Sequence, residues 1–596
     1  MCGIFGFTDG FIDPKALIKK MASLLVHRGP DGEGFFLDDS VSMGMRRLSI
    51  IDIAHGNQPF FSQDGTIVAF CNGEIYNYKE LREELIAKGF EFKTNSDVEV
   101  IPHLFSLYGT DFAKKLNGMY AIAIYDRKDK SIYLVRDRLG IKPLYYSVIG
   151  NRLIYASEIK PILASGIQRE PDMDAISTYL ELMYIPAPST PFKNIYKLES
   201  GKILHWSNGR ISTYRYWDLS LREVAAPDED AIISQLDEIL NDSVRLELRS
   251  DVEVGSLLSG GVDSSIITAI AAIKSPNKLS AFHMQWNSVK GKIDESKYAE
   301  AVSGKYSANL FIQDVDKIDI PALLPKLIFH LEEPFADAAF IPTYLLSNIA
   351  SKKVKVILSG AGGDELLGGY AQYGNISYFK SLLKSLLFDK NPYSSYFDLI
   401  SNPSGFNWKG TFNWFKAKSM KSVFEEKFAA FSGTDRINAM MLNDLSVYLQ
   451  DDILFLTDKM SMAASLETRV PYLDHRLVEL CQNIPSAIKL KNRISKYLLK
   501  KLGEKYLPKD LIYRQKEGFG SPVWLWVNQY KDLYFDYMLE NGYLVKNNLI
   551  SKDMINHFTY KTRLGIKDSW QYWHIIVLEI WFRLFIEGQS NDEIFN

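Results

Sequence analysis

Leu257-Leu258-Ser259-Gly260-Gly261-Val262-Asp263-Ser264-Ser265 is a loop rich in glycine and serine, between an apolar run, Val252–Leu258, and a helical pattern that begins near Ser264. Two adjacent glycines allow the backbone to approach a ligand closely, and the first amides of a helix attract an anion. The loop lacks the Gly-Lys-Ser/Thr ending of a Walker loop, which excludes that class of nucleotide site. We therefore expect a strand, an anion-binding turn and a helix in an open α/β sheet, whose ligands bind at the carboxyl ends of the strands.

Strands and helices alternate on both sides of this loop, which is typical of a parallel sheet. A helical pattern over Ala231–Leu248 comes before it. The later elements predicted from the alternation are the strands Leu279–Trp286, Leu310–Asp314 and Val354–Leu358 and the helices Glu295–Tyr306 and Ala338–Ser351. After Tyr370 the pattern is mostly helical, so we expect an α/β domain with a helical C-terminal part.

A second turn rich in glycine and acid, Ser359-Gly360-Ala361-Gly362-Gly363-Asp364-Glu365, follows the strand Val354–Leu358. In a parallel sheet both turns lie at the same edge, so Asp263 and Asp364 can converge on one Mg²⁺ together with phosphate oxygens. Taken singly, either aspartate would be interpreted as a helix N-cap. The two turns together predict a metal site that uses both carboxylates.

Residues 1–206 have a different pattern, with short strands separated by turns such as Gln63-Asp64-Gly65. The predicted strands are Ser42–Leu48, Thr66–Asn72, Met119–Tyr125, Ser131–Arg136 and Arg152–Ser157, followed by a hairpin near Gly201–Trp206. Tyr78–Lys88 is predicted as a helix and the proline-rich Tyr184–Pro191 as an extended connector. We expect a β-rich domain over residues 1–206, a linker over 207–229 and a second domain over 230–596.

Cys2 follows the initiator methionine in Met1-Cys2-Gly3-Ile4-Phe5-Gly6. Removal of Met1 would leave a thiol and a free α-amine on one residue. A free thiol titrates near ~8.5 and an α-amine near ~7.7–8.0, so the amine can accept a proton close to neutral pH. One residue would then supply both nucleophile and base, as in enzymes that use an N-terminal threonine. Taken alone, the position would be interpreted as an accidental cysteine, and the rest of the chain reverses that interpretation.

The composition narrows the class of protein. The 596 residues are 46% hydrophobic and 24% charged with a net charge of −3, which favours a soluble protein of several domains and gives no reason to expect nucleic acid or a membrane as partner. The three cysteines, Cys2, Cys71 and Cys481, are far apart and predict no disulfide. The sequence has no apolar stretch of about 18 residues and no secretory leader pattern, so we expect a cytoplasmic protein.

Further motifs run in order through nearly the whole chain. They are Met1–Gly6, His27–Asp31, Arg47–Ile50, Asn72–Asn77, Ser96-Asp97, Arg136-Asp137, Ser259–Ser265, Ser359–Glu365, Ser461–Asp474 and Arg514–Phe519. In these motifs the chain resembles glutamine-hydrolysing asparagine synthetases. The resemblance implies a class II glutamine amidotransferase domain, with the αββα sandwich of N-terminal nucleophile hydrolases, followed by a parallel-sheet ATP-pyrophosphatase synthetase domain.

The resemblance implies that Cys2 attacks the side-chain amide of glutamine and forms a γ-glutamyl thioester. The side chain of Asn72 and the backbone amide of Gly73 would form the oxyanion hole, whose donors stabilise charge that develops in the transition state. The residues assigned in this way to glutamine binding are Arg47, Leu48, Ile50, Asn72, Gly73, Glu74 and Asp97. A free amino acid is a zwitterion, which agrees with a cation, Arg47, for its carboxylate and an anion, Asp97, for its amine.

The second domain would bind ATP and Mg²⁺ by the same resemblance. The residues assigned to the nucleotide are Leu257, Ser259, Gly260, Gly261, Asp263, Ser264, Met284, Ser359, Gly360 and Lys516, and those assigned to the metal are Asp263 and Asp364. Lys516 corresponds to the family lysine that contacts the phosphates or the acyl-adenylate. Glu467 and Arg469 fall in a family segment near the site, where a catalytic or a structural role would fit equally.

The implied enzyme is a carbon–nitrogen ligase that converts aspartate, glutamine and ATP to asparagine, glutamate, AMP and pyrophosphate through an acyl-adenylate. Ammonium is protonated and cannot attack, so neutral ammonia made at Cys2 would pass to the second site inside the protein. The expected partners are these small molecules, with a homodimer as the family-level expectation. The chain departs from the best-known members at Ala361, where they carry a glutamate, so Glu365, Glu332, Glu333 or a substrate group must handle the proton, or the acceptor chemistry differs.

Three alternatives stay open. The same two domains could amidate another carboxylate, such as a sugar uronic acid in polysaccharide biosynthesis. The chain could also be a catalytically silent regulatory relative, although Cys2, Asn72, Gly73, Asp263 and Asp364 are all present. A tRNA-modifying enzyme with a similar pyrophosphatase loop is disfavoured by the nearly neutral charge.

Overall fold

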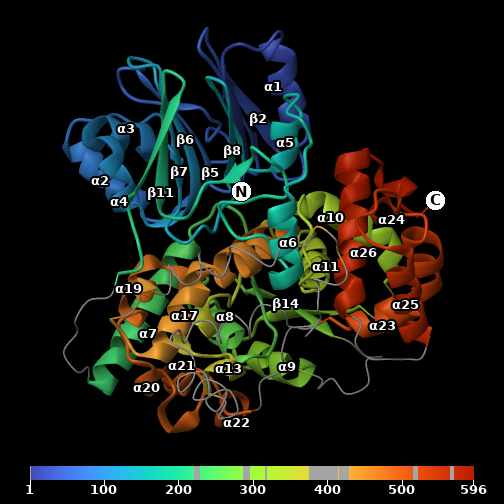
Figure 1. The fold of residues 1–596 in the computed structure, drawn as a ribbon. Coiled ribbons are helices and arrows are strands. Elements are labelled where there is room, and N and C mark those ends of the chain that lie inside the picture. Colours follow the sequence, from blue (N-terminus) through green and yellow to red (C-terminus); the bar gives the residue numbers. More distant parts are fainter. Residues whose placement is uncertain are drawn as a thin grey trace.

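The architecture is taken from a computed structural model, which describes residues 2–220, 228–285, 295–315, 318–374, 412, 414, 429–431, 433–514, 521–563 and 570–595. Two antiparallel sheets form the N-terminal part, and a parallel sheet surrounded by helices forms the rest (Figure 1). Along the ranges just given, no helix has both the length and the apolar character that crossing a membrane requires.

The two N-terminal sheets stack face to face. The first has the strand order β10-β8-β9-β1-β3-β2 and the second β12-β11-β7-β6-β5-β4. The strands are β1 Gly3–Thr8, β2 Gly32–Leu37, β3 Val41–Arg47, β4 Phe60–Phe61, β5 Ile67–Ile75, β6 Gly118–Asp126, β7 Ser131–Arg136, β8 Tyr145–Ile149, β9 Arg152–Ala156, β10 Tyr196–Lys197, β11 Lys202–Ser207 and β12 Arg210–Arg215. Strand β1 lies between β9 and β3, and both of these strands end close to its first residues. Cys2, the residue before β1, therefore lies near the ends of both neighbouring strands.

Strand β5 shows why this part forms a sandwich. Val68 and Phe70 point into the core between the sheets, whereas Ala69 and Cys71 point into the core between the second sheet and its helices. Side chains alternate between the two faces of a strand, so successive apolar residues favour a strand that is buried on both sides. The covering helices are α2 Tyr78–Ala87, α3 Val100–Tyr108 and α4 Phe112–Lys115 on the second sheet and α1 Pro14–Ser23 and α5 Ile159–Leu163 on the first. The predicted αββα layering is confirmed.

The parallel sheet has the strand order β15-β14-β13-β16-β17, and each neighbouring pair is parallel. Its strands are β13 Val254–Leu257, β14 Ser280–Gln285, β15 Asn309–Asp314, β16 Val356–Leu358 and β17 Glu467–Arg469. The chain runs outward from β13 through β14 to β15, then returns to place β16 on the other side of β13. The carboxyl ends of β13 and β16 therefore form the switch point at which open α/β sheets bind ligands.

Helices surround this sheet and continue to the C-terminal side, as the sequence pattern predicts (Figure 1). They are α6 Met173–Leu182, α7 Glu229–Glu247, α8 Val262–Lys274, α9 Ser296–Lys305, α10 Ile320–Leu331, α11 Phe340–Ala350, α12 Gly363–Leu367, α13 Ala371–Gly374, α17 Arg436–Ser446, α18 Leu454–Ala463, α19 His475–Cys481, α20 Ser486–Lys489, α21 Tyr497–Gly503, α22 Lys509–Ile512, α23 Val523–Gln529, α24 Tyr543–Lys546, α25 Lys552–Arg563 and α26 Trp570–Phe582. Helix α26 is buried from Gln571 to Phe582 and packs against α10, whereas Trp570 at its start is exposed.

Strands β1, β2, β4, β8, β10, β12 and β17 lie where the sequence analysis named no strand, and the last two change the predicted organisation of the chain. Strand β12, Arg210–Arg215, falls inside the predicted linker and pairs antiparallel with β11. All its side chains are exposed, so no apolar face marks it as a strand. Strand β17 has three residues, two of them charged, and pairs with β16. Because β12 lies within the linker predicted over 207–229, that linker begins later than expected. Strand β17 adds an edge strand to the parallel sheet from a segment far along the chain.

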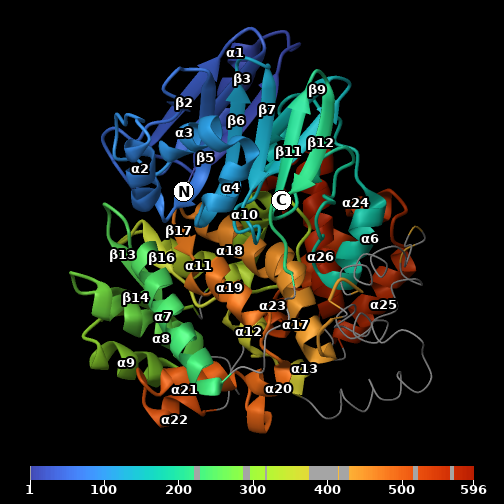
Figure 2. The same ribbon diagram turned by 90° about the vertical axis from the view of Figure 1, so that its left-hand side faces the viewer.

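The sandwich and the parallel sheet pack directly against each other (Figure 2). Leu48, Ile50 and Ile51, from the loop after β3, form one buried cluster with Val356 of β16 and Met462 of α18. The loop that follows β3 is thus fixed by apolar contact with the second part of the chain.

Buried ion pairs also cross this junction. Arg28 Nη1 lies 2.8 Å from Asp458 Oδ2 of α18 and 3.3 Å from Glu158 Oε1. Lys160 Nζ lies 3.0 Å from both Glu158 Oε2 and Glu332 Oε1. Charges that have left water are stable only while their partners remain, so these pairs fix one mutual orientation of the two parts.

Replacing Arg28 by methionine is expected to destabilise the protein by about 3–5 kcal/mol, because Asp458 and Glu158 would stay buried with one cation fewer. The matched control is Lys19→Met, which breaks an exposed 2.8 Å pair with Glu33 and should cost less than about 1 kcal/mol. Calorimetric unfolding of both variants checks this difference. Similar losses in the two variants would show that the junction does not depend on the buried pairs.

Candidate active sites

Cys2 lies at the buried start of β1. Its backbone nitrogen donates to Asn72 Oδ1 at 3.0 Å, and its carbonyl oxygen accepts a hydrogen bond from Arg28 Nε at 3.2 Å. Burial raises the pKa of the Cys2 thiol, and the nearby Arg47 guanidinium offsets only part of this increase. A thiol that stays protonated at neutral pH needs a base, and the nitrogen held by Asn72 is the atom that loss of Met1 would turn into an α-amine.

Asn72 and Gly73 lie in the middle of the antiparallel pairing of β5 with β6, beside Cys2. The Asn72 Nδ2 atom lies 3.5 Å from Ser157 Oγ, so both ends of this amide have partners. Gly73 has a φ of +151°, and a Cβ atom there would lie 2.0 Å from the Met119 carbonyl oxygen. Only glycine fits this position, and its backbone is thereby fixed next to the thiol.

Arg47, at the end of β3, is buried and fully hydrogen-bonded through its two terminal nitrogens. Nη1 donates to the Ile53 carbonyl at 3.2 Å and to Asn57 Oδ1 at 2.9 Å, and Nη2 donates to the Ile51 and Asp52 carbonyls at 3.0 and 2.8 Å. The guanidinium therefore shapes the loop after β3. A glutamine carboxylate would have to share or replace some of these bonds.

Of the two other predicted residues of this loop, Leu48 lies beside Cys2 through its backbone, whereas the backbone contact of Ile50 is with the second part of the chain. The Leu48 backbone is close enough to the Cys2 sulfur to lower the pKa of the thiol, against the larger effect of burial. The Ile50 carbonyl accepts the Asp251 amide at 3.0 Å, and its side chain is buried in the junction cluster. The side chains of Leu48 and Ile50 are buried where the two parts of the chain meet, and this packing holds the loop in place.

Glu74 and Asp97 supply buried acid next to Cys2. Asp97 Oδ2 accepts the Ile75 amide at 2.8 Å. Burial raises the pKa of Asp97 to about 6, and the charge of Glu467 adds to this shift. Burial, followed by the charges of Asp97 and Glu467, raises the pKa of Glu74 well above its usual range. The site therefore has more carboxyls than cations, which suits the cationic amine of an amino acid.

Strand β17 brings two charged residues from the second part of the chain to this site. Arg469 Nε lies 2.7 Å from Glu467 Oε1, and Arg469 Nη2 lies 3.5 Å from Glu74 Oε2. Burial would raise the pKa of Glu467, but nearby cations, Arg469 and Lys142 among them, lower it to about 2. The sequence pattern left Glu467 and Arg469 without a definite role, and the structure places them where the two parts meet at the Cys2 site.

The glycine- and serine-rich loop forms a compact turn at the carboxyl end of β13. The Ser259 and Ser264 hydroxyls lie 2.9 Å apart, and the Gly261 amide donates to Ser259 Oγ at 3.2 Å. Gly260 has a φ of +82°, and its carbonyl accepts a hydrogen bond from Arg514 Nη2 at 3.0 Å. Helix α8 starts directly after this turn, so the amides of its first turn and the two hydroxyls lie together at the carboxyl end of β13, an arrangement that suits an anion.

Asp263 and Asp364 converge, as expected from their two turns. Lys496 Nζ lies 2.5 Å from Asp263 Oδ2 and 2.7 Å from Asp364 Oδ1. Two carboxylates that already share one cation are suitable ligands for Mg²⁺, provided that phosphate oxygens or water complete its coordination. Among the residues that the structure describes, no group of three or more His, Cys, Asp or Glu residues could hold a metal by itself. Sequence reasoning missed Lys496, because a lysine before a helix is usually interpreted as a surface charge.

The remaining predicted nucleotide residues line the same edge of the sheet. They are Leu257 at the end of β13, Met284 near the end of β14, and Ser359 and Gly360 after β16. A Cβ atom on Gly360 would lie 2.9 Å from the Ser264 amide nitrogen, so this turn lies directly against the start of α8. Met284 is half-buried. Lys516 lies outside the described residues.

Ala361 carries no acid, and the three suggested substitutes lie in two places. Glu332 and Glu333 are ion-paired at the junction, Glu332 with Lys160 at 3.0 Å and Glu333 with Lys197 at 2.8 Å. Glu365, in contrast, follows Asp364 directly, and burial, followed by the charge of Asp364, raises its pKa to about 7. Of the three, only Glu365 adjoins the Gly/Asp turn.

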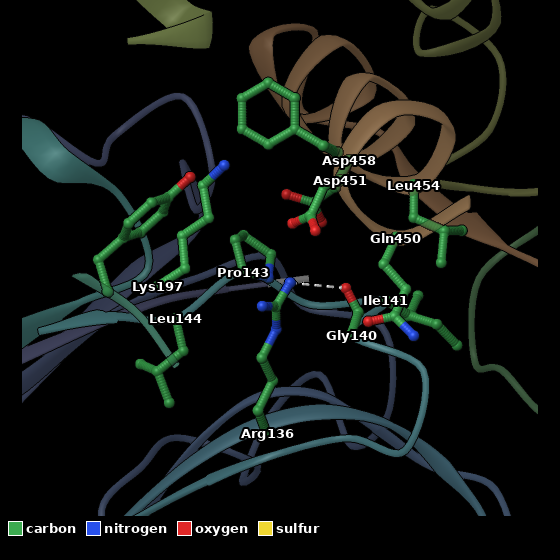
Figure 3. A pocket seen from close by; sticks show the side chains of 12 residues that line it. Arg136, Gly140, Ile141, Pro143, Leu144, Lys197, Gln450, Asp451, Leu454 and Asp458 are labelled. Atoms are coloured by element: carbon green, nitrogen blue, oxygen red, sulfur yellow. Dashed lines mark hydrogen bonds between the residues drawn. The ribbon is translucent and has the colours of Figure 1, made fainter. Parts of the chain in front are cut away.

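A small pocket opens at the junction between the two parts (Figure 3). Arg136, Leu144 and Lys197 line it from the sandwich, and Asp451 and Asp458 point into it from the helical side. The pocket is small and has both charged and apolar side chains in its lining, and it shows that the junction is not completely filled by side chains.

Two family profiles match the chain, one described as a glutamine amidotransferase domain over residues 1–217 and one as asparagine synthase over residues 235–583. Asparagine synthetase [glutamine-hydrolyzing] 1 of Bacillus subtilis is 33% identical and covers 100% of this chain and 98% of its own length. Asparagine synthetase [glutamine-hydrolyzing] 3 of the same organism is 30% identical over 87% of each chain. The glutamine phosphoribosylpyrophosphate amidotransferase structure from B. subtilis is 19% identical, covers 46% of this chain and 64% of its own, and has a TM-score of 0.28, too low to support an argument.

Proposed function

Because the chain belongs to the glutamine-hydrolysing asparagine synthetase family, we propose that it transfers the amide nitrogen of glutamine to aspartate and forms asparagine, glutamate, AMP and pyrophosphate from ATP. The observation that supports this most strongly is the junction itself. Glu467 and Arg469 lie on the parallel sheet, next to the strand that leads to the Ser359–Glu365 turn, and Arg469 pairs with both Glu467 and the buried Glu74 beside Cys2. Buried contacts within one chain therefore connect the Cys2 thiol with the sheet edge that we propose binds the nucleotide.

At the first site, the Cys2 sulfur would attack the side-chain carbon of glutamine after passing its proton to the α-amine of the same residue. The developing oxyanion would be met by the Gly73 amide and the Asn72 side chain. Collapse of this intermediate breaks the carbon–nitrogen bond, and the nitrogen leaves as ammonia with the proton returned by the amine. Water then hydrolyses the thioester to glutamate and restores Cys2.

At the second site, a carboxylate oxygen of the acceptor would attack the α-phosphorus of ATP and release pyrophosphate. The α8 amides and the Ser259 and Ser264 hydroxyls would hold the phosphates, with Lys496 offsetting their charge. Asp263 and Asp364 would hold Mg²⁺, which when bound neutralises phosphate charge. Ammonia would then attack the acyl carbon, the bond to the AMP oxygen would break, and the extra proton on nitrogen would pass to Glu365.

Aspartate-dependent pyrophosphate release is the direct test of this proposal. Purified protein is supplied with ATP, Mg²⁺ and glutamine, together with aspartate or one of a panel of other carboxylates, and pyrophosphate and product amide are measured. Equal amounts of pyrophosphate and asparagine are expected. Pyrophosphate release with a sugar acid but not with aspartate would show that the acceptor is the sugar acid. No pyrophosphate release with any carboxylate would favour a catalytically silent relative.

The Michaelis constant for glutamine is expected to rise by about tenfold for each pH unit below pH 6, because protonated Asp97 no longer attracts the substrate ammonium. Burial, aided by the Glu467 charge, raises the pKa of Asp97 to about 6, so the anion is present above that pH and lost below it. Glutaminase kinetics between pH 5 and 8 check this. The Asp97→Asn variant should show a high Michaelis constant that no longer changes across this range, and a constant value in the unmodified protein would contradict the role.

We also place the protein in the cytoplasm and expect a homodimer. All three cysteines are free and buried, which supports a reducing compartment. The dimer is expected from the family alone, and sedimentation of the purified chain would test it.

A further inference from the structure

Two carboxyls that the proposed mechanism does not use, the half-buried Asp337 and the fully buried Asp452, lie next to each other near the second site. Asp452 lies in a π-helical turn, Leu449–Ile453, and Asp337 lies just before α11. Their side chains are within hydrogen-bond reach of each other, and Asp337 Oδ1 accepts the Ala339 amide at 2.9 Å. Asp452 has an exposed fraction of 0%, and neither of its carboxylate oxygens accepts a hydrogen bond from a donor among the described residues.

No cation in the described part of the chain compensates this pair. The pKa of Asp452 is raised well above its usual range, first by burial and then by the charges of Asp337, Asp451 and Glu365, all of which are carboxyls. Burial also raises the pKa of Asp337. A buried carboxylate without a counter-charge is costly, and two of them together form a strongly cation-attracting position.

Two tyrosines, Tyr448 and Tyr184, lie near Asp452. Tyr448 lies one turn before Asp452, and after burial the largest influences on the pKa of its hydroxyl are the charges of Asp452 and Asp337. The Tyr448 ring centroid lies 6.3 Å from that of Tyr184 and 6.1 Å from that of Tyr370. Carboxylates together with aromatic faces are suited to an organic ammonium group. A divalent metal would need about six oxygen ligands, which the described side chains here do not supply.

The pair lies beside the Gly/Asp turn. Tyr370, whose ring packs on Tyr448, donates its hydroxyl to Glu365 Oε1 at 2.5 Å, and Glu365 adjoins Asp364. On the other side, Ser521 Oγ donates to the Ala338 carbonyl at 2.7 Å. The carboxyl pair is therefore separated from Asp364 by a short chain of contacting side chains.

We propose that Asp337 and Asp452 bind the α-ammonium group of the acceptor, which would make the acceptor an amino acid and not a sugar acid; this inference rests on the function proposed above. An entering ammonium supplies a positive charge next to the pair and donates hydrogen bonds to the Asp452 oxygens, for which the described residues offer no donor. A uronic acid has no cation to place there and would leave the pair uncompensated. A free ammonium ion offers the same chemistry as the acceptor amine, so the experiment must distinguish these two sources.

The test compares aspartate with succinate, which is aspartate without its amine, in the full-length protein. Pyrophosphate release is measured with ammonium chloride as nitrogen source while each acid, and then ammonium, is varied. In Asp452→Asn and Asp337→Asn, kcat/KM for aspartate should fall roughly 10- to 100-fold, as expected when a hydrogen-bonded charge is removed, and the value for succinate should change less than about twofold. Asp451→Asn is the matched control from the same turn, because the Asp451 carboxylate accepts the Ala187 amide at 3.0 Å, and it should keep the preference for aspartate. Glutaminase activity reports whether each variant is folded.

Several outcomes would overturn the inference. An unchanged preference for aspartate in both variants would do so, as would a rise in KM for ammonium alone, which would assign the pair to the nitrogen donor. Equal use of the two acids by the unmodified protein would also contradict it, even if neither variant folded. In each of these cases aspartate-dependent pyrophosphate release would survive, whereas its absence in the unmodified protein would remove the proposed function itself.

Discussion

The Cys2→Ala variant is expected to lose glutamine-dependent product formation by more than about a thousandfold, because removal of the nucleophile leaves no thioester route to ammonia. The same variant should keep most of its activity with ammonium salts, since the anion turn, Asp263 and Asp364 all lie in the second part of the chain. Rates of pyrophosphate release with each nitrogen source, measured on one preparation, check this separation.

Cys71→Ala is the matched control for this variant. Cys71 is also buried, on β5 one residue before Asn72, but its side chain points into the core under the covering helices. It should keep both activities. If Cys2→Ala lost ammonium-dependent synthesis to the same extent as glutamine-dependent synthesis, the two sites would not divide the reaction as proposed.

The second large effect is expected in Lys496→Met. Lys496 is almost completely buried and bridges Asp263 and Asp364, so the variant leaves two adjacent carboxylates and the incoming phosphates without this cation. Pyrophosphate release should fall roughly 10²- to 10³-fold with either nitrogen source. Glutamine hydrolysis at Cys2 should continue, because Lys496 is not among the groups that influence the Cys2 thiol.

Lys501→Met provides the comparison for Lys496→Met. Lys501 lies in α21, the helix that begins directly after Lys496, and its amine forms a 3.0 Å pair with Glu504 at the surface. It should behave like the unmodified protein. Retention of normal pyrophosphate release in Lys496→Met would show that the bridge between the two aspartates has no part in ATP chemistry.

Much of the fold could be predicted because its local patterns are strong. Strand β7 matches the predicted Ser131–Arg136 at both ends, and β9, α2 and α7 begin or end within two residues of expectation. The glycine turns after β13 and β16 were also predictable, because each follows an apolar strand and opens a helix. These elements depend on neighbouring residues, which a single sequence displays directly.

The rest depends on contacts between distant segments. Strand β17 has three residues and no apolar alternation, and it exists as a strand because its backbone pairs with β16. Glu467 and Lys496 reach their sites from positions far along the chain, so no spacing in the sequence connects them with Cys2 or Asp263. The carboxyl pair of Asp337 and Asp452 was hidden for the same reason, since each residue alone is typical of a helix end.

The account depends on ammonia that is made at Cys2 being used at the ATP site of the same molecule. The most direct measurement supplies glutamine labelled with ¹⁵N in its amide, together with an excess of unlabelled ammonium, and follows the label in the product by mass spectrometry. We expect asparagine that carries the label well above its proportion in the mixed nitrogen pool. Asparagine labelled only in that proportion, or no amide product at all, would contradict the account.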